Sequence, residues 1–295
     1  MMRIGFIGLG NMGGGMAANL VKAGHAVQAS DLSAEATARA AQVGCTIAAS
    51  AREAVQGVDA VVTMLPNGAI VDGVYRGEVL EHAPASALLL DCSTIDVATA
   101  RDVAAGAAQA GYAMVDAPVS GGIAAANSGT LTFMVGGTNE AFARAEPILA
   151  SMGKAVIHAG GNGAGQSAKI CNNLILASQM IGTCEGLALA VKLGLDPQVF
   201  FNIASKATGQ SWSLNSYCPL PGVGPQSPAD NGYHGGFASA LMLKDLRLAL
   251  AAAKDAGSLV PLGERAEQLY AAFTNGETDG GSNAVLDFSG IIRSL

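Results

Sequence analysis

The sequence has few charged residues, few aromatic residues and no run of basic residues. Charged side chains make up 13% of its 295 residues and aromatic ones 5%, and the formal net charge is −7. The absence of a basic cluster argues against a nucleic-acid partner. A disordered chain combines low hydrophobicity with high charge, whereas half of these residues are hydrophobic. The composition therefore indicates a compact globular protein.

Cysteine and histidine are also scarce, and neither forms a metal-binding pattern. The five cysteines contain no CxxC pair, most of them lie in apolar runs, and the four histidines are scattered. This distribution is typical of reduced, buried thiols in a cytoplasmic protein rather than of disulfides or a zinc site. We therefore expect no metal.

No segment reads as a membrane anchor or a leader. Met1 is followed at once by a β-rich run, which indicates neither a signal nor a transit segment. The most apolar long stretch, residues 170–194, contains Asn, Gln, Glu and Lys. A membrane span needs about 20 nearly uninterrupted apolar residues. We therefore expect a buried helix here, no membrane partner and a cytoplasmic location.

Short apolar runs alternate with helical patterns in the first half of the chain. Strands are expected at 3–8, 26–31, 45–49, 60–66 and 87–94, and in the runs AMVDAPVSGG, LTFMVGG and AVIHAG. Helices are expected between them, for example from Ser33 through Ala41 and over 96–111. Such apolar strands separated by helices predict a mostly parallel sheet that is covered on both faces.

The pattern changes near Gly160. A single long helix is expected from Gln166 to Leu193, and only helical segments follow it. We predict an α/β fold in which a Rossmann-type NAD-binding domain over residues 1–162 precedes an all-helical domain over residues 163–295. The long helix joins the two domains.

A glycine motif follows the first strand and opens a helix. It reads Gly8-Leu9-Gly10-Asn11-Met12-Gly13, a GxGxxG in the context that gives this pattern meaning. The first glycine permits a tight turn, the second admits a pyrophosphate, and the third lets the helix pack on the strand. The helix N-terminus then favours the phosphate charge. An ordinary glycine turn is the alternative, and the context favours a dinucleotide site.

An acidic residue, Asp31, ends the next strand. A carboxylate there accepts hydrogen bonds from a ribose and repels a 2′-phosphate, which favours NAD over NADP. Other strand ends should face the cofactor too, because ligands bind at the carboxyl ends of parallel strands. Leu65, Pro66 and Thr94 are therefore expected beside NAD, although Thr94 could instead be a helix cap, a role for which Asp96 competes.

Two further groups could handle a substrate. Ser120-Gly121-Gly122 can cradle a carboxylate with a hydroxyl and two N–H groups, or can form an ordinary turn. Lys169 and Asn173 are four residues apart, so they share one face of a helix. Burial would lower the pKa of Lys169 towards the range of a proton carrier, whereas a solvated lysine would have no such role.

Four blocks together resemble the β-hydroxyacid dehydrogenase family: GLGNMGGGMAANLVKAG at 8–24, DAPVSGG at 116–122, GAGQSAKICNN at 163–173 and LKD at 243–245. The spacing of the blocks also resembles the family, so the resemblance covers the whole chain. It implies a dinucleotide-binding domain, a helical second domain, and a homodimer or homotetramer that forms through the helical domains.

The resemblance also implies roles for particular residues. Ser120, Gly121 and Gly122 would hold the carboxylate of a small hydroxy acid, Lys169 would carry the proton, and Asn173 would orient the substrate. Lys244 would reach the nicotinamide end of the cofactor and Phe237 would pack there, although a local Lys244–Asp245 ion pair is the simpler interpretation. Trp212, the only tryptophan, could form a wall for a substrate methyl group or merely fill a gap.

The run SWSLNSYCPLPGVGP (211–225) resembles the 3-hydroxyisobutyrate branch of the family. We therefore expect NAD-dependent oxidation of 3-hydroxyisobutyrate to methylmalonate semialdehyde, a step of valine degradation. Tartronate semialdehyde and 4-hydroxybutyrate are alternative substrates. A 6-phosphogluconate-type substrate needs a phosphate clamp, and only three arginines follow residue 160, at 247, 265 and 293. Lys169 argues against an imine reductase and against a non-catalytic NAD sensor.

Overall fold

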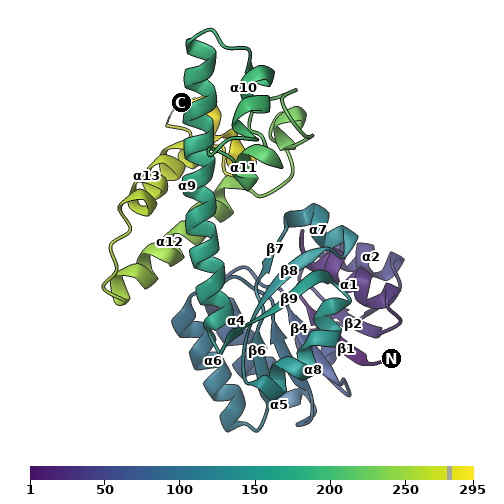
Figure 1. Cartoon of the computed structure of the whole chain (residues 1–295). Helices are drawn as coiled ribbons and strands as arrows, with labels where there is room; N and C mark the ends of the chain where they lie inside the picture. Colours follow the sequence, from purple (N-terminus) through teal and green to yellow (C-terminus); the bar gives the residue numbers. More distant parts are fainter. Residues whose placement is uncertain (278–280) are drawn as a thin grey trace. The chain divides into compact units, whose positions relative to one another are not determined.

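The computed structural model describes residues 1–277 and 281–295, and it divides into two compact units, Met1–Lys169 and Ile170–Leu295 (Figure 1). The division falls inside helix α9 (Ala164–Lys192), seven residues after the end expected for the first domain. The domain boundary at 162/163 stays a prediction.

The first unit is built on one sheet. Its strands are β1 (Arg3–Ile7), β2 (Ala26–Ser30), β3 (Thr46–Ile47), β4 (Ala60–Thr63), β5 (Leu88–Asp91), β6 (Ala113–Asp116), β7 (Val119–Ser120), β8 (Leu131–Gly136) and β9 (Gly153–Gly160). Their order is β3-β2-β1-β4-β5-β6-β8-β7, with β9 beside β8. All pairs from β3 to β6 are parallel, whereas β8 runs antiparallel to β6 and β7. The predicted mostly parallel sheet is confirmed.

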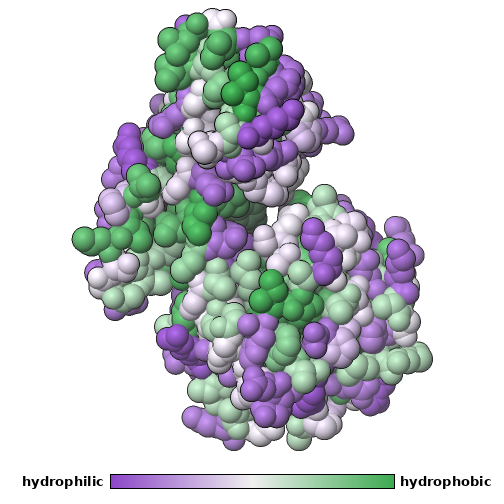
Figure 2. All heavy atoms as spheres, viewed as in Figure 1, coloured by the Kyte–Doolittle hydropathy of each residue, from purple (hydrophilic) through white to green (hydrophobic). Residues whose placement is uncertain are grey.

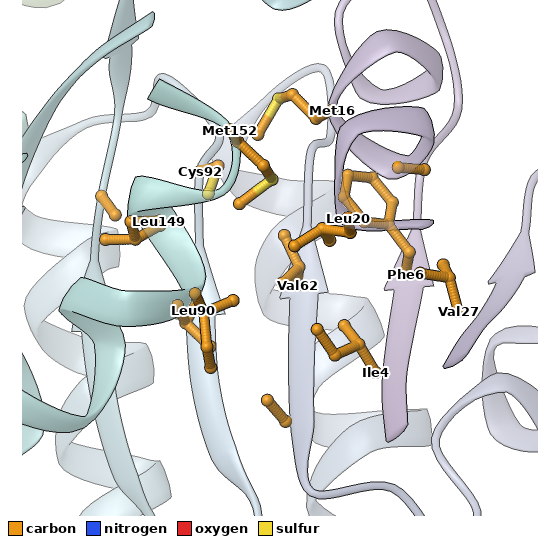
Figure 3. Close-up of a cluster of buried hydrophobic side chains, with 14 of the residues drawn as sticks. Ile4, Phe6, Met16, Leu20, Val27, Val62, Leu90, Cys92, Leu149 and Met152 are labelled. Carbon is orange, nitrogen blue, oxygen red and sulfur yellow. The ribbon is translucent and has the colours of Figure 1, made fainter. Parts of the chain in front are cut away.

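Helices cover both faces of this sheet. They are α1 (Gly13–Lys22), α2 (Ala34–Gln42), α3 (Ala51–Ala54), α4 (Gly68–Val74), the π-helix η1 (Tyr75–Val79), α5 (Leu80–His82), α6 (Val97–Gln109), α7 (Gly122–Ser128) and α8 (Asn139–Ala150). Side chains of α1, α2 and α8 pack with Leu88 and Leu90 in one core (Figure 3), whereas α3, α4, η1 and α6 pack with Leu89 in the other. Alternate residues of one strand thus face opposite layers, which explains the continuous apolar run.

Parts of the first unit differ from the prediction. The run AMVDAPVSGG was expected to be one strand, and it forms β6 and β7, which are interrupted at Ala117 and Pro118 but pair with β8 in one continuous antiparallel register. Pro118 lies at this break and has no N–H to donate to a sheet. Helix α7 then starts directly after Gly121, where two glycines had indicated only a turn.

The second unit is helical throughout its described residues, as predicted. After α9 come α10 (Pro197–Ala204), α11 (Trp212–Asn215), the 3₁₀ helix η2 (Pro228–Asn231), α12 (Ser239–Asp255), α13 (Pro261–Asn275) and the 3₁₀ helix η3 (Phe288–Ser294). Met180 and Cys184 of α9 pack on Leu246, Tyr270 and Phe273 in its core. By length and composition α9 could cross a membrane, but core helices of globular proteins have the same properties.

All five cysteines are free thiols. Four of them are buried, at positions 45, 92, 184 and 218, as the apolar sequence context suggested. Cys171 is the exception, because it lies on an exposed side of α9. Burial raises the pKa of each of the four buried thiols.

Candidate active site

The GxGxxG glycines occupy three different steric environments. Gly8 directly follows β1 and has φ +95°, and a Cβ there would lie 2.3 Å from the carbonyl oxygen of Met64. A Cβ on Gly13 would lie 1.9 Å from the Gly8 carbonyl oxygen, so α1 packs directly on the turn. A Cβ on Gly10 would meet no described atom within 4 Å. The space above Gly10 is therefore open, and its backbone can approach a ligand closely.

Asp31 lies directly after β2 and is bound to the glycine turn. Its Oδ2 accepts the N–H of Leu9 at 2.6 Å, and its Oδ1 accepts the N–H of Ser33 at 2.7 Å. A carboxylate offers about four acceptor positions, so two remain for hydroxyl groups of a ribose. The carboxylate thus fits a nucleoside and at the same time fixes the turn.

The N-terminus of α1 is suited to an anion. No side chain of a described residue caps it, whereas Ser33 caps α2 and Asp96 caps α6. Free N–H groups and the positive end of the helix dipole favour a phosphate at such a terminus. Together with the open space above Gly10, this terminus fits the pyrophosphate of a dinucleotide.

Leu65, Pro66 and Thr94 lie at the same sheet edge as Gly8 and Asp31. Each of them follows a strand of the parallel part of the sheet, after β4 or β5. Leu65 and Thr94 are half-buried and Pro66 is exposed. The cap of α6 is Asp96, whose Oδ1 accepts the N–H of Thr99 at 2.7 Å. The capping role weighed for Thr94 is therefore filled by Asp96.

A buried carboxylate, that of Asp91, is hydrogen-bonded to residues at this sheet edge. Asp91 is 1% exposed, and its Oδ1 accepts hydrogen bonds from the hydroxyls of Thr63 at 2.7 Å and Ser93 at 2.6 Å. Ser93 Oγ in turn accepts the N–H of Leu65 at 2.8 Å. Burial raises the pKa of Asp91 to about 6, and the hydrogen bonds from Ser93 and Thr63 oppose that rise. The chain of bonds fixes the loop that carries Leu65.

Ser120, Gly121 and Gly122 form the entry to α7. Gly121 has φ +134° and Gly122 has φ +70°, and a Cβ on Gly122 would meet no described atom within 4 Å. The N–H groups at this helix start have no side-chain cap among the described residues. Asn19 of α1 donates to the carbonyl oxygen of Ala126 at 2.7 Å and so ties α7 to the glycine-motif helix.

The start of α9 is anchored to the ends of two strands. Asp116, after which β6 ends, accepts the backbone N–H of Gly163 at 2.7 Å and of Gln166 at 2.9 Å. Gly165 is required here, because a Cβ would lie 2.4 Å from the carbonyl oxygen of Met134. Burial raises the pKa of Asp116, and the bonds from Gly163 and Gln166 oppose it.

Gln166 is fully buried one turn before Lys169. Its Nε2 donates to the Ser93 carbonyl oxygen at 2.7 Å, and its Oε1 accepts the N–H of Ile95 at 3.1 Å. Lys169 itself is 7% exposed, and among the described residues it is the only buried lysine or arginine. Burying a lysine is costly, so its position is unusual for a purely structural residue.

In the helical unit, Asn173 belongs to a network of amides and charges. Its Nδ2 donates to Oδ2 of Asp245 at 2.6 Å, and its Oδ1 accepts from Asn172 at 3.0 Å. Lys244 Nζ lies 3.4 Å from the other carboxylate oxygen, so the local ion pair considered for Lys244 is present. Asn172 therefore orients the Asn173 amide, which has a second N–H besides the one that Asp245 accepts.

Trp212 and Phe237 belong to one aromatic cluster of the helical unit. Trp212 begins α11 and stacks on Tyr217 at 4.7 Å between ring centroids. Tyr217 stacks on Phe288 at 5.6 Å, and Phe237 contacts Phe288 edge-on at 5.8 Å. Phe237 lies two residues before the start of α12.

Two family models match successive parts of the chain. Residues 3–161 match the NAD-binding domain of 6-phosphogluconate dehydrogenase, and residues 163–295 match the NAD-binding domain of NADP-dependent 3-hydroxyisobutyrate dehydrogenase. The chain is 49% identical to the 3-hydroxyisobutyrate dehydrogenase of Pseudomonas aeruginosa over 99% of its length and 97% of that protein. The chain belongs to the β-hydroxyacid dehydrogenase family. It is an NAD-dependent oxidoreductase of that family.

Other members of the family are similar over nearly the same length. An NAD-dependent L-serine dehydrogenase of Pseudomonas aeruginosa is 48% identical, over 92% of this chain and 91% of that protein. A structure of Mycobacterium tuberculosis 3-hydroxyisobutyrate dehydrogenase with L-serine has a TM-score of 0.92 and 47% identity, and covers 100% of this chain and 99% of that one. The predicted fold and family are thereby confirmed.

The predicted site residues fall in both units. In the first unit, one sheet edge carries the glycine motif, Asp31, Leu65, Pro66 and Thr94. Ser120–Gly122 lead into α7, and Lys169 lies in α9. In the second, Asn173 and Lys244 meet at Asp245, and Trp212 and Phe237 meet through Tyr217 and Phe288.

Sequence reasoning missed most of the supporting residues. These are Gln166, Asp91, Asp116, Tyr217 and Asp287, whose hydrogen-bond partners lie mostly far away in the sequence. Asp116 and Gln166 alone carried a signal, because they lie in the DAPVSGG and GAGQSAKICNN blocks.

Proposed function

We propose that the chain oxidises 3-hydroxyisobutyrate to methylmalonate semialdehyde with NAD, a step of valine degradation. The single observation that carries the chemistry is the buried Lys169, which lies one turn after the fully buried Gln166. The match along nearly the whole length of a 3-hydroxyisobutyrate dehydrogenase supports the substrate.

In this proposal the protein residues bind the substrate and move one proton. NAD, held at the sheet edge by the glycine motif and Asp31, would supply the hydride acceptor for the carbinol carbon. Ser120 and the N–H groups of Gly121 and Gly122 hold the substrate carboxylate. Asn173, with one N–H engaged by Asp245, directs the other to the reacting oxygen. Lys169 Nζ takes the hydroxyl proton as the hydride leaves, so the alcohol loses two electrons and two protons in total.

The cofactor contacts follow from the first unit. The N–H groups at the start of α1 bind the pyrophosphate, and Asp31 accepts from the adenosine ribose. Leu65, Pro66 and Thr94 lie along the same sheet edge beside the cofactor. Lys244 and Phe237 are proposed to meet its nicotinamide end.

L-serine is a second candidate substrate. It is favoured by the 48% identical L-serine dehydrogenase and by the related structure that contains L-serine. L-serine carries an ammonium group where 3-hydroxyisobutyrate carries a methyl group. Trp212 is proposed to contact the methyl group of 3-hydroxyisobutyrate.

A substrate panel separates these candidates. The purified chain is assayed with NAD and 3-hydroxyisobutyrate, L-serine or 4-hydroxybutyrate, and with NADH and tartronate semialdehyde. We expect the highest kcat/KM for 3-hydroxyisobutyrate, by roughly 10-fold or more. A higher value for L-serine or another compound would transfer the assignment to that compound.

Lys169→Met tests the proton carrier. We expect kcat to fall by roughly 10²- to 10⁴-fold, as for the loss of a general base, while the Kd for NADH changes little. Lys154→Met, at an exposed position in β9 of the same unit, is the matched control and should keep full activity. Substantial remaining activity in the Lys169 variant would exclude this role.

We also propose that the chain forms a homodimer or homotetramer through its helical unit. Exposed large apolar side chains gather there, and Figure 2 shows such residues in green on its surface. Leu174, Ile175 and Leu262 line a shallow cavity of about 420 Å³ whose surface is nearly all apolar. Such a patch is typical of an interface between subunits.

The cellular compartment of the chain is also a proposal. A cytoplasmic location suits the four buried free thiols and the composition. Relatives from Drosophila melanogaster and Mus musculus carry the word mitochondrial in their names. We propose the cytoplasm for this chain.

A further inference from the structure

The side chain of Gln166 connects α9 to the loop that follows β5. Its Nε2 donates to the carbonyl oxygen of Ser93 at 2.7 Å, and its Oε1 accepts the N–H of Ile95 at 3.1 Å. These two backbone groups stand on either side of Thr94 in the chain. One carboxamide therefore fixes the backbone both before and after Thr94.

This loop begins where the β4–β5 ladder ends. There the N–H of Cys92 donates to the carbonyl oxygen of Thr63 at 2.8 Å. Ser93 and Ile95 follow and are almost fully buried. A buried backbone N–H or C=O without a partner is costly, so the loop needs a donor and an acceptor from another segment. The amide of Gln166 supplies one of each.

The side chain of Ser93 fixes the same loop from a second direction. Its Oγ donates to Oδ1 of Asp91 at 2.6 Å and accepts the N–H of Leu65 at 2.8 Å. Leu65 lies in the loop after β4. The loops after β4 and β5 are thus joined to each other, and Gln166 joins them to α9.

Thr94 carries the accessible surface of this stretch. It is half-buried, whereas Ser93 is 0% and Ile95 is 1% exposed. The loop lies at the carboxyl ends of the parallel strands, the edge that also carries Gly8 and Asp31. In the proposed function, this surface of Thr94 lies beside NAD.

Lys169 stands three residues after Gln166, so the two side chains lie on the same side of α9. The backbone at the start of this helix is fixed independently of both side chains, because Asp116 accepts the N–H groups of Gly163 and Gln166 at 2.7 and 2.9 Å. All of these residues belong to the first unit, Met1–Lys169. A short series of buried hydrogen bonds therefore connects Thr94 with the helix that carries Lys169.

We propose that Gln166 is a positioning residue of the oxidoreductase, which holds Thr94 against the cofactor and keeps Lys169 at a fixed spacing from it. This rests on the cofactor contacts and the proton carrier of the proposed function. Gln166 is fully buried, so it acts through the backbone around Thr94 without touching NAD or substrate. Spacing matters because a displacement of about 1 Å can lower a rate by roughly 10²-fold.

The first arm of the test measures NADH binding in the absence of substrate. Gln166→Met removes both hydrogen bonds of the amide and fills nearly the same volume. We expect the Kd for NADH to rise by about five- to tenfold, the effect of one lost hydrogen bond. Gln109→Met, at the exposed end of α6, is the matched control and should leave this Kd unchanged. Circular dichroism checks that each variant is folded in the assay.

A double-mutant cycle separates positioning from a general loss of structure. Thr94→Val removes the hydroxyl group and should raise the Kd for NADH by about five- to tenfold on its own. Because Gln166 acts through Thr94, the double variant should bind NADH no more than about twofold more weakly than the weaker single variant.

Asp31→Asn provides the reference cycle at the ribose end of the cofactor. Asp31 is bonded to Leu9 and Ser33 and not to the loop that Gln166 holds. Its effect on the Kd for NADH should therefore multiply with that of Gln166→Met, as expected for independent sites. If Gln166→Met does not fold, Gln166→Asn carries both cycles, since its amide is one methylene too short to reach both backbone groups.

The second arm measures turnover of 3-hydroxyisobutyrate at saturating NAD. We expect the kcat of Gln166→Met to fall by about tenfold or more, because the proton carrier and the hydride acceptor lose their fixed spacing. Gln109→Met should keep the kcat of the wild type.

Three results would overturn the proposal. The first is an unchanged Kd for NADH in a folded Gln166 variant. The second is a Gln166–Thr94 cycle in which the two effects multiply as fully as in the Asp31 cycle. The third is an unchanged kcat at saturating NAD. If no hydroxy acid is oxidised at all, the proposed function fails, whereas the two NADH cycles still decide whether Gln166 holds Thr94.

Discussion

Asp91 shows how one buried residue couples stability to pH. The carboxyl group is buried, so water does not screen its charge, and burial raises its pKa from 3.8 to about 6. Between these two values the native state binds the proton more tightly than the unfolded state. The free energy of unfolding therefore falls as the pH rises through this window, and the loss is complete above about pH 6.

Replacing Asp91 by Asn removes this titration. A shift of this size corresponds to about 3 kcal/mol. We therefore expect the free energy of unfolding of the wild type, relative to Asp91→Asn, to fall by about 2 kcal/mol between pH 4 and pH 7, with the rest of the change below pH 4. Urea unfolding at a series of pH values measures it. A difference between the two proteins that does not vary with pH would contradict the prediction.

Single residues were predictable where their signal is local. Gly8, Gly10 and Asp31 follow from the strand, the turn and the strand end beside them. The partners of Asn173 did not, because Asp245 lies 72 residues away and no spacing links the two. Asn172, which had no assigned role, becomes intelligible only through its bond to Asn173.

At the scale of elements, the start of α9 depends on Gln166. Its side-chain amide pairs with the Ser93 carbonyl and the Ile95 N–H, and both of these bonds are buried. In Gln166→Leu the two backbone groups would lose their partner, and each unpaired buried group costs about 1–3 kcal/mol. We expect the free energy of unfolding to fall by roughly 2–5 kcal/mol in denaturant unfolding.

A matched variant separates this effect from a general loss of glutamine. Gln109→Leu lies at the exposed end of α6 in the same unit, and surface changes usually shift stability by less than about 0.5 kcal/mol. If both variants unfold at the wild-type denaturant concentration, Gln166 does not anchor α9.

The elements were predicted best where apolar periodicity is continuous. The parallel strands and α9 were found within a few residues. Segment 68–82, which forms α4, η1 and α5, was left unassigned, and α7 was missed because Gly121 and Gly122 indicate a turn. The interruption between β6 and β7 was missed too, because it falls at Pro118 inside the run that was expected to be one strand.

For the whole molecule, the exposed apolar side chains of the helical unit predict self-association. We expect the wild type to elute as a multiple of 29.4 kDa in size-exclusion chromatography with light scattering. Leu262 is 74% exposed beside the apolar cavity, and Leu262→Glu would place an unpaired charge in the interface. The dissociation constant should rise by at least about 10-fold.

The control variant introduces a glutamate at an exposed apolar position of the first unit. Val43→Glu, at an exposed position after α2, should leave the mass unchanged. A wild-type protein that already runs at 29.4 kDa would rule out the association itself.

The distribution of the thiols allows the chain to be labelled at a single position. Cys171 is exposed and lies two residues from Lys169, while burial raises the pKa of the other four thiols and so suppresses their reactive thiolate form. A thiol-reactive dye will therefore attach at one position without any engineered cysteine. Two residues along a helix are about 200° apart, so the dye would lie on the side of α9 opposite Lys169 and would mark the helix without covering the proposed proton carrier.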